Sequence, residues 1–288
     1  MDMRLVWIVG ALAVLAGLVG LAVVRPLTAF NLLVPKDPAA DLVGKGVAYG
    51  ALPRQRLDIY RPVTATESLP VILFFYGGAW NSGRRQDYSF VGQALAARGY
   101  LVVIPDYRLV PEVRFPSFLE DCAQALRWTR RNASSFGGDG GRLILAGHSA
   151  GAYNAAMLAL DTRWLGEDRL AVRGLVTLAG PFDFLPLDDP ATIATFSRWP
   201  SPEETQPIRF ASRAAPPTLL LHGEDDDRVR PRNSRQLDAA LNGAGAQAEL
   251  RLYPSVNHAG ILLALARPLR GNAPVLDDID RFVRQAVR

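Results

Sequence analysis

One serine stands in a sequence context that can make its hydroxyl group a nucleophile. Residues 147–151 read Gly-His-Ser-Ala-Gly, after the apolar run "RLILA" and before the helical stretch "AYNAAMLAL". Between a strand and a helix, a G-x-S-x-G motif is typical of a nucleophile elbow, whose glycines allow a sharp turn and a close passage of strand and helix. We therefore predict that Ser149 is a nucleophile with the positive end of a helix dipole beneath it.

A serine hydroxyl needs a base to take its proton, and the chain has only three histidines to offer. His148 is adjacent to Ser149 in a sharp turn, so we expect its ring to point elsewhere. His222 ends an apolar run and is interpreted as structural. The chain order that accompanies this type of elbow is nucleophile, acid, base. His258, in "LYPSVNHAG", is the only histidine that follows both the serine and the acidic run at 224–227, and it is the predicted base.

Four consecutive acidic residues, 224–227, follow the apolar run "TLLLHG". A carboxylate in this loop can accept the second imidazole proton and fix the tautomer of the base. Adjacent like charges repel, so we expect one of Asp225, Asp226 and Asp227 to carry this role. The others should face solvent or lie at the start of the next helix, where the helix dipole favours them.

A pair of glycines after another apolar run indicates a site for a negatively charged oxygen. The run "VILFFYGGAW" (71–80) contains Gly77 and Gly78, which allow backbone N–H groups to face inward. We expect the N–H groups of Gly78 and Ala79, with that of Ala150 after the nucleophile, to form an oxyanion hole.

All of these motifs lie where apolar runs end, and the pattern of those runs predicts the fold. Short apolar runs alternate with helical stretches, including a long helix over 116–134, which indicates a right-handed parallel α/β sheet. Chemistry in such sheets lies at the carboxyl ends of the strands. The run "RLDIYRP" (56–62) alternates in polarity, as an exposed strand would.

Taken together, the motifs resemble the α/β-hydrolase superfamily, and within it the hormone-sensitive-lipase-like and BD-FAE-like esterases and the kynurenine formamidases. The block "DYRLVPEVRFPSFLEDCAQALRW", the "GGAW" turn, "GPFDF" and "APPTLLLHG" carry the resemblance, which covers residues 46–288. It implies an eight-stranded, mostly parallel sheet flanked by helices, with a short cap. The acid loop of the superfamily reads G-x-x-D-x-x-V, which Gly223, Asp226 and Val229 match. The resemblance therefore implies Asp226 as the acid, with Asp225 as its main competitor.

The chain departs from these families at two points. Tyr76 stands where they have a histidine before the glycines, and the elbow reads GHSAG, closer to the BD-FAE and formamidase branch than to lipase-like members. The resemblance implies a serine carboxylesterase that works through an acyl-enzyme, with no metal and no cofactor. An arylformamidase with the same machinery is the alternative, and a catalytically silent, tethered binding module is the third hypothesis.

The substrate pocket is expected beside the cap that this fold inserts at residues 181–217. Phe182, Phe184 and Trp80 are predicted to line it, with core packing as the alternative for each. Because the cap is small, we expect an open site that takes soluble, modest-sized esters.

The N-terminus is expected to interact with a membrane. Residues 5–24 contain no charge, and 20 residues of helix span roughly 30 Å, the thickness of a hydrocarbon core. We predict that residues 1–25 are an uncleaved transmembrane anchor, with a cleaved signal peptide or a buried core helix as alternatives. Residues 26–45 would form a linker and residues 46–288 the catalytic domain. That domain is expected on the exported (periplasmic or extracellular) side, and secreted if the segment is cleaved.

Composition argues against a nucleic-acid partner and against cysteine-based sites. The net charge of +4 comes from arginines spread along the chain, which argues against a nucleic-acid partner. Cys122 is the only cysteine, so an internal disulfide and a multi-cysteine metal site are both excluded.

Overall fold

The computed structural model describes residue 7, residues 25–65 and residues 68–288. Apart from Trp7, the predicted membrane segment at residues 5–24 lies outside the described residues. Within the described ranges, no helix combines the length and the apolar character needed to cross a bilayer.

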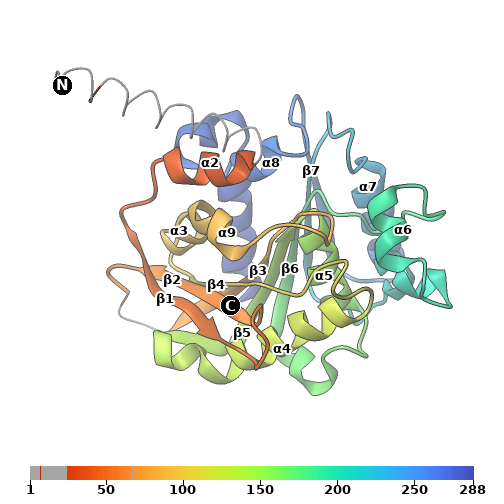
Figure 1. Cartoon of the computed structure of the whole chain (residues 1–288), viewed down its shortest axis with the longest axis horizontal. Helices are drawn as coiled ribbons and strands as arrows, with labels where there is room; N and C mark the ends of the chain where they lie inside the picture. The colour runs from red at the N-terminus through yellow and green to blue at the C-terminus, as the bar shows by residue number, and fades with distance from the viewer. Residues whose placement is uncertain (1–6, 8–24, 66–67) are drawn as a thin grey trace.

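The described chain is organised around one eight-stranded sheet with the strand order β1-β2-β4-β3-β5-β6-β7-β8 (Figure 1). The β1–β2 and β2–β4 pairs are antiparallel, and every other neighbouring pair is parallel. This confirms the predicted α/β-hydrolase sheet. The strands are β1 (Ala40–Ala48), β2 (Arg56–Pro62), β3 (Leu69–Phe75), β4 (Leu101–Pro105), β5 (Gly138–His148), β6 (Val172–Leu178), β7 (Thr218–Gly223) and β8 (Ala248–Tyr253).

Helices cover both faces of the sheet. α4 packs with α5 on one face, and α3 packs with α9 on the other (Figure 1). The central strands are therefore buried from both sides, which is why they read as continuous apolar runs such as "VILFF" in β3. The helices are α2 (Pro26–Leu33), α3 (Ser89–Ala96), α4 (Ser117–Asn132), α5 (Ala150–Leu160), α6 (Pro190–Phe196), α7 (Arg232–Gly243), α8 (Gly260–Leu263) and α9 (Val275–Ala286).

The interpretation of residues 56–62 as an exposed strand is wrong. This segment is β2, which pairs with β1 on one side and β4 on the other and has α3 packed against it. Leu57 and Ile59 are fully buried. Asp58 creates the alternating pattern in the sequence, yet it is also buried and forms an ion pair with Arg85 at 2.9 Å. The polar residue in the pattern is therefore paired inside the protein, and the alternation does not mark a strand with one face in solvent.

The predicted linker at residues 26–45 also differs from the structure, because both halves of it are folded onto the domain. Residues 26–33 form α2, and residues 40–48 form the edge strand β1. Hydrogen bonds hold α2 in place: the Thr28 hydroxyl donates to Asp87 (2.9 Å), and the Asn31 amide donates to the carbonyl of Gln86 (2.9 Å). Phe30 packs edge-to-face on Phe90, with ring centroids 5.4 Å apart. The folded unit thus begins about 20 residues earlier than expected.

Candidate active site

The turn between β5 and α5 has the strained geometry of a nucleophile elbow. Ser149 lies there with φ 54° and ψ −124°, a conformation that L-residues rarely adopt. The glycines on either side are required by close packing. A Cβ on Gly147 would lie 2.3 Å from the carbonyl oxygen of Gly151, and a Cβ on Gly151 would lie 2.0 Å from that of Phe75. Both glycines of the motif are therefore needed, because any side chain at either position would clash with the backbone.

The structure brings Ser149, His258 and Asp226 into one hydrogen-bonded chain. The Nε2 atom of His258 is 3.0 Å from the Ser149 Oγ, and its Nδ1 atom is 2.8 Å from the Asp226 Oδ2. The three side chains come from the carboxyl ends of β5, β7 and β8, so the parallel sheet delivers them to a single edge. With Nδ1–H donating to the carboxylate, Nε2 is left free to accept the serine proton.

Among the four consecutive acidic residues, Asp226 alone is buried; Asp225 and Asp227 are exposed, as expected. Its Oδ1 atom accepts hydrogen bonds from the backbone N–H groups of Arg228 (3.0 Å) and Val229 (2.9 Å). Burial on its own would raise the pKa of this carboxyl group. The hydrogen bonds from two histidines and from the backbone outweigh burial and hold the pKa well below its usual value, so the group stays ionised.

The second histidine beside this carboxylate is His222, whose contact with Asp226 the sequence did not reveal. It is fully buried, with Nε2 2.7 Å from the carbonyl oxygen of Val229 and 3.2 Å from the Asp226 Oδ2. Nε2 therefore carries a proton, and Nδ1 pairs with the Ser234 hydroxyl at 2.7 Å. His222 is structural, as interpreted from the sequence, because it stabilises the loop after β7 that carries Asp226. Its position directly before Gly223 at the end of β7 was the available signal.

His148 also lies at the site, although it was expected to point elsewhere. Its ring packs against that of His258, with centroids 4.9 Å apart, and its Nε2–H donates to the main-chain carbonyl of His258 at 3.0 Å. Burial, followed by the proximity of the His258 ring, lowers the pKa of His148 to about 3. The side chain is therefore neutral near pH 7 and holds the loop that carries His258.

The loop after β3 lies directly against the elbow. A Cβ on Gly77 would come within 3.0 Å of the Ser149 Cβ. Three consecutive residues have positive φ, namely Gly78 (134°), Ala79 (49°) and Trp80 (57°), so the backbone is strained there. The predicted oxyanion donors Gly78, Ala79 and Ala150 all line the same cavity as Ser149. Their role as N–H donors remains a prediction that this geometry permits.

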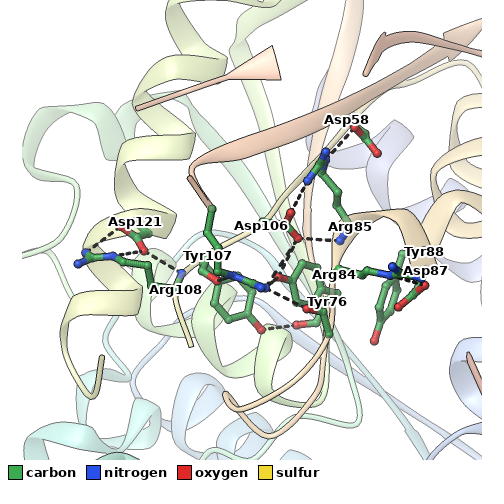
Figure 2. Close-up of polar contacts among 12 residues, drawn as sticks. Asp58, Tyr76, Arg84, Arg85, Asp87, Tyr88, Asp106, Tyr107, Arg108 and Asp121 are labelled. Carbon is green, nitrogen blue, oxygen red and sulfur yellow. Dashed lines mark hydrogen bonds and ion pairs between the residues drawn. The ribbon is translucent and has the colours of Figure 1, made fainter. Parts of the chain in front are cut away.

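A buried polar network supports that loop from behind, and Tyr76 is its centre (Figure 2). The Tyr76 hydroxyl donates to Asp106 (3.0 Å) and accepts from the Arg54 guanidinium (2.8 Å). Arg54 also donates to the carbonyl oxygen of Gly83 at the far end of the loop. The Tyr76 ring stacks on Tyr107, with centroids 4.8 Å apart. Burial and the Asp106 charge raise the pKa of Tyr76 well above its usual value, so the hydroxyl keeps its proton.

The predicted pocket residues divide between the cavity and the core. Trp80 and Phe184 line the cavity, although Trp80 is only 3% exposed and donates through its indole N–H to Asn154 (3.1 Å). Phe182 does not line it. Its ring is fully buried against Gly180, where an added Cβ would lie 2.4 Å from a ring carbon. The prediction for Phe182 is wrong because the chain turns it into the core.

The cavity above Ser149 has a volume of about 1150 Å³. One wall is apolar, and Leu27 and Phe30 of α2 and Leu262 and Leu263 of α8 belong to it. The exposed arginines Arg228, Arg230 and Arg232 line another part. Among the described residues, no group of three or more His, Cys, Asp or Glu side chains is arranged to hold a metal ion.

Comparisons with known proteins agree with this geometry. The BD-FAE family model matches residues 57–241. An isoprenylcysteine alpha-carbonyl methylesterase of Arabidopsis thaliana is 32% identical over 263 residues, which cover 82% of this chain and 61% of that protein. The esterase LipC of Mycobacterium tuberculosis is 30% identical over 84% of this chain and 65% of its own length. The chain thus spans a little under two thirds of these two relatives. Esterase 2 of Thermogutta terrifontis, solved after phosphoramylation by tabun, shares the fold with a TM-score of 0.71, at 21% identity over 87% of this chain and 96% of that one.

Proposed function

The chain belongs to the BD-FAE family, among the α/β-hydrolase esterases, and from this premise we propose that it is a serine hydrolase that cleaves carboxylic esters. The observation that carries the proposal is the hydrogen-bonded chain from Ser149 through His258 to Asp226. Two of the relatives named above are esterases by name, which agrees with this reaction class.

The proposed mechanism uses each of these groups in turn. The Ser149 oxygen attacks the ester carbonyl while His258 takes the hydroxyl proton, and the ionised Asp226 stabilises the resulting imidazolium. Backbone N–H groups of Gly78, Ala79 and Ala150 stabilise the oxyanion of the tetrahedral intermediate. His258 then returns the proton to the departing alcohol, and the acyl group stays on the serine. A water molecule, deprotonated by His258, attacks the acyl-enzyme and releases the acid.

Replacing the nucleophile tests the proposal. Ser149→Ala should lower kcat/KM for a short p-nitrophenyl ester by about 10⁶-fold, because the covalent step is lost. The matched control is Ser135→Ala at an exposed serine, which should stay within about twofold of the wild type. Circular dichroism spectra should coincide for all three proteins. Substantial turnover by a folded Ser149→Ala protein would contradict the mechanism.

The ester preference needs a substrate panel. A carboxyl methyl ester, acyl esters of rising chain length, methyl ferulate and N-formylkynurenine would separate an esterase from an arylformamidase with the same machinery. We expect the esters to be the better substrates. A kcat/KM for the formamide above that of every ester would favour the formamidase instead.

We further propose that residues 5–24 anchor the protein in a membrane, with the catalytic domain on the exported side. The uncharged run of 20 residues supports this proposal. Full-length protein should stay with membranes after alkaline carbonate extraction, and external protease should reach the domain in intact cells or spheroplasts. A soluble protein whose measured mass lacks the first residues would show a cleaved signal instead.

A further inference from the structure

The helix α2 buries two polar residues and exposes two leucines, which is unusual for a helix on the surface of a soluble domain. Its polar residues Thr28 and Asn31 are buried and make hydrogen bonds to the domain. On the outer side, Leu32 and Leu33 are 64% and 67% exposed. A helix in water normally turns its leucines inward and its polar groups outward. This arrangement is stable when the outer face meets an apolar medium.

The same helix forms part of the wall of the active-site cavity. Leu27 and Phe30 line the cavity from α2, and Leu262 and Leu263 line the same cavity from α8 (Figure 1). The apolar wall is therefore continuous with the helix whose outer leucines are exposed. A volume of about 1150 Å³ is more than a short ester needs, since pockets for ligands of drug size occupy roughly 300–1,000 Å³.

The position of α2 along the chain points to the medium that it meets. α2 begins at Pro26, separated by Arg25 alone from the uncharged run at residues 5–24. If that run enters a bilayer, α2 must lie at the bilayer surface. Arg25 is exposed at one end of the helix, and Arg267 is exposed at the other, where it donates to the Lys36 carbonyl. Cations in these positions suit anionic lipid headgroups.

We infer that the substrate is an amphiphilic ester drawn from the bilayer, with its apolar chain along the wall formed by α2 and α8 and its ester group at Ser149. In this arrangement Leu32 and Leu33 rest in the membrane interface and hold the mouth of the cavity against the lipid. The inference rests on the proposed function and names its substrate class. It differs from the expectation of soluble, modest-sized esters, which followed from the short cap alone.

The first test measures how α2 affects chain-length preference, with full-length protein in detergent. Wild-type kcat/KM should rise from p-nitrophenyl acetate to p-nitrophenyl decanoate. Leu27→Ala should lower this decanoate-to-acetate ratio by about 10-fold, because it removes apolar contact along the chain. The volume-conserving control Leu27→Met should keep the ratio within about threefold. A wild-type ratio below one, or equal losses on both esters in Leu27→Ala, would overturn the inference.

The second test addresses the outer face, which does not touch the reacting ester. The double variant Leu32→Ser/Leu33→Ser should match the wild type on p-nitrophenyl acetate in detergent, since neither leucine lines the cavity. In vesicles of phosphatidylcholine and phosphatidylglycerol that contain a long-chain diacylglycerol, its turnover should fall about fivefold or more, as interfacial binding scales with buried apolar area. Equal turnover in vesicles would overturn the inference.

A change of the variant from dimer to monomer in detergent would also overturn it, because the leucines would then cover a second copy of the chain. These results are separable from those that bear on the proposed function. If the wild type cleaves no ester at all, the proposed function fails. If it cleaves acetate through Ser149 but discriminates against long chains and vesicle-bound esters, only the present inference fails.

Discussion

The two sides of the active-site cavity differ in how firmly their residues are held by the rest of the protein. At the sheet edge, Ser149 has a strained backbone, and the carboxylate of Asp226 receives four hydrogen bonds from the backbone and two histidines. At the rim, α2 presents two exposed leucines, and the three arginines that line another part of the cavity are exposed as well. The side chains at the sheet edge are held by many contacts within the protein, whereas those at the rim are largely exposed to solvent.

We expect from this contrast that the reaction and the choice of substrate depend on separate residues. Buried polar groups are costly unless each is hydrogen-bonded, so the sheet edge tolerates few changes and should treat all esters alike. Leu27 and Phe30 of α2 offer apolar contacts to whatever enters the cavity, so changes there should alter the ranking of substrates. Variants at the sheet edge should therefore lower activity on every ester by the same factor, and losses that depend on the ester would contradict this separation.

After Ser149→Ala, the largest effect is expected at the acid loop. Asp226→Asn should lower kcat/KM by about 10³–10⁴-fold, because the amide no longer stabilises the imidazolium or fixes the His258 tautomer. The loss should be the same for acetate and decanoate esters. The neighbouring variant Asp225→Asn is the matched control and should remain within about twofold of wild type, since Asp225 is exposed. Similar losses in both variants would remove Asp226 from the mechanism.

An intermediate effect is expected in the network behind the oxyanion loop. Tyr76→Phe leaves Asp106 and Arg54 without their shared hydroxyl partner, which should lower the free energy of unfolding by about 1–3 kcal/mol. Because the same network supports the loop of Gly78 and Ala79, kcat should fall about three- to tenfold on every ester, with KM unchanged. Urea unfolding and steady-state kinetics measure the two effects.

The control for this variant lies at the opposite edge of the sheet. Tyr100→Phe removes a comparable hydrogen bond, from the Tyr100 hydroxyl to Asp280 at 2.6 Å, beside the first residue of β4. It should lower stability and leave kcat unchanged. If Tyr76→Phe lowered stability alone, the network would be structural only.

The smallest effect is expected in the pH dependence of stability. The pKa of buried His148 is about 3, below that of a solvated histidine near 6.5, so between these values the unfolded chain binds the proton more tightly. This histidine therefore makes the free energy of unfolding fall with decreasing pH in that window, by at most about 1.4 kcal/mol per pH unit. His148→Gln has no such proton to bind and should show a shallower slope between pH 6 and 4. Equal slopes would mean that His148 is charged or solvated in the folded protein.

The sequence predicted the sheet and the elbow because short-range rules determine them. A side chain at Gly147 would meet the Gly151 carbonyl within the same turn, a limit that acts within five residues, and the order of serine, acid and histidine singled out His258. Asp226 followed from its spacing to Gly223, and the backbone bonds from Arg228 and Val229 explain physically why that position is buried.

What the sequence did not reveal depends on contacts between distant segments. Asp58 pairs with Arg85 across 27 positions, so its burial could not be read from the alternation in β2. Thr28 and Asn31 make α2 part of the domain only through partners near residue 87. His148 acquires its role from a carbonyl group 110 residues away. Side chains with such long-range partners cannot be assigned from local pattern.

A covalent label on the nucleophile tests the role of Ser149 without relying on a substitution. Full-length protein incubated with diethyl p-nitrophenyl phosphate should gain one diethylphosphoryl group per chain, mapped by peptide mass spectrometry to Ser149, and should lose esterase activity in parallel. In Asp226→Asn the same label should form far more slowly. A stoichiometric label on any other residue, or full activity in protein labelled at Ser149, would contradict a mechanism in which this serine carries the acyl group.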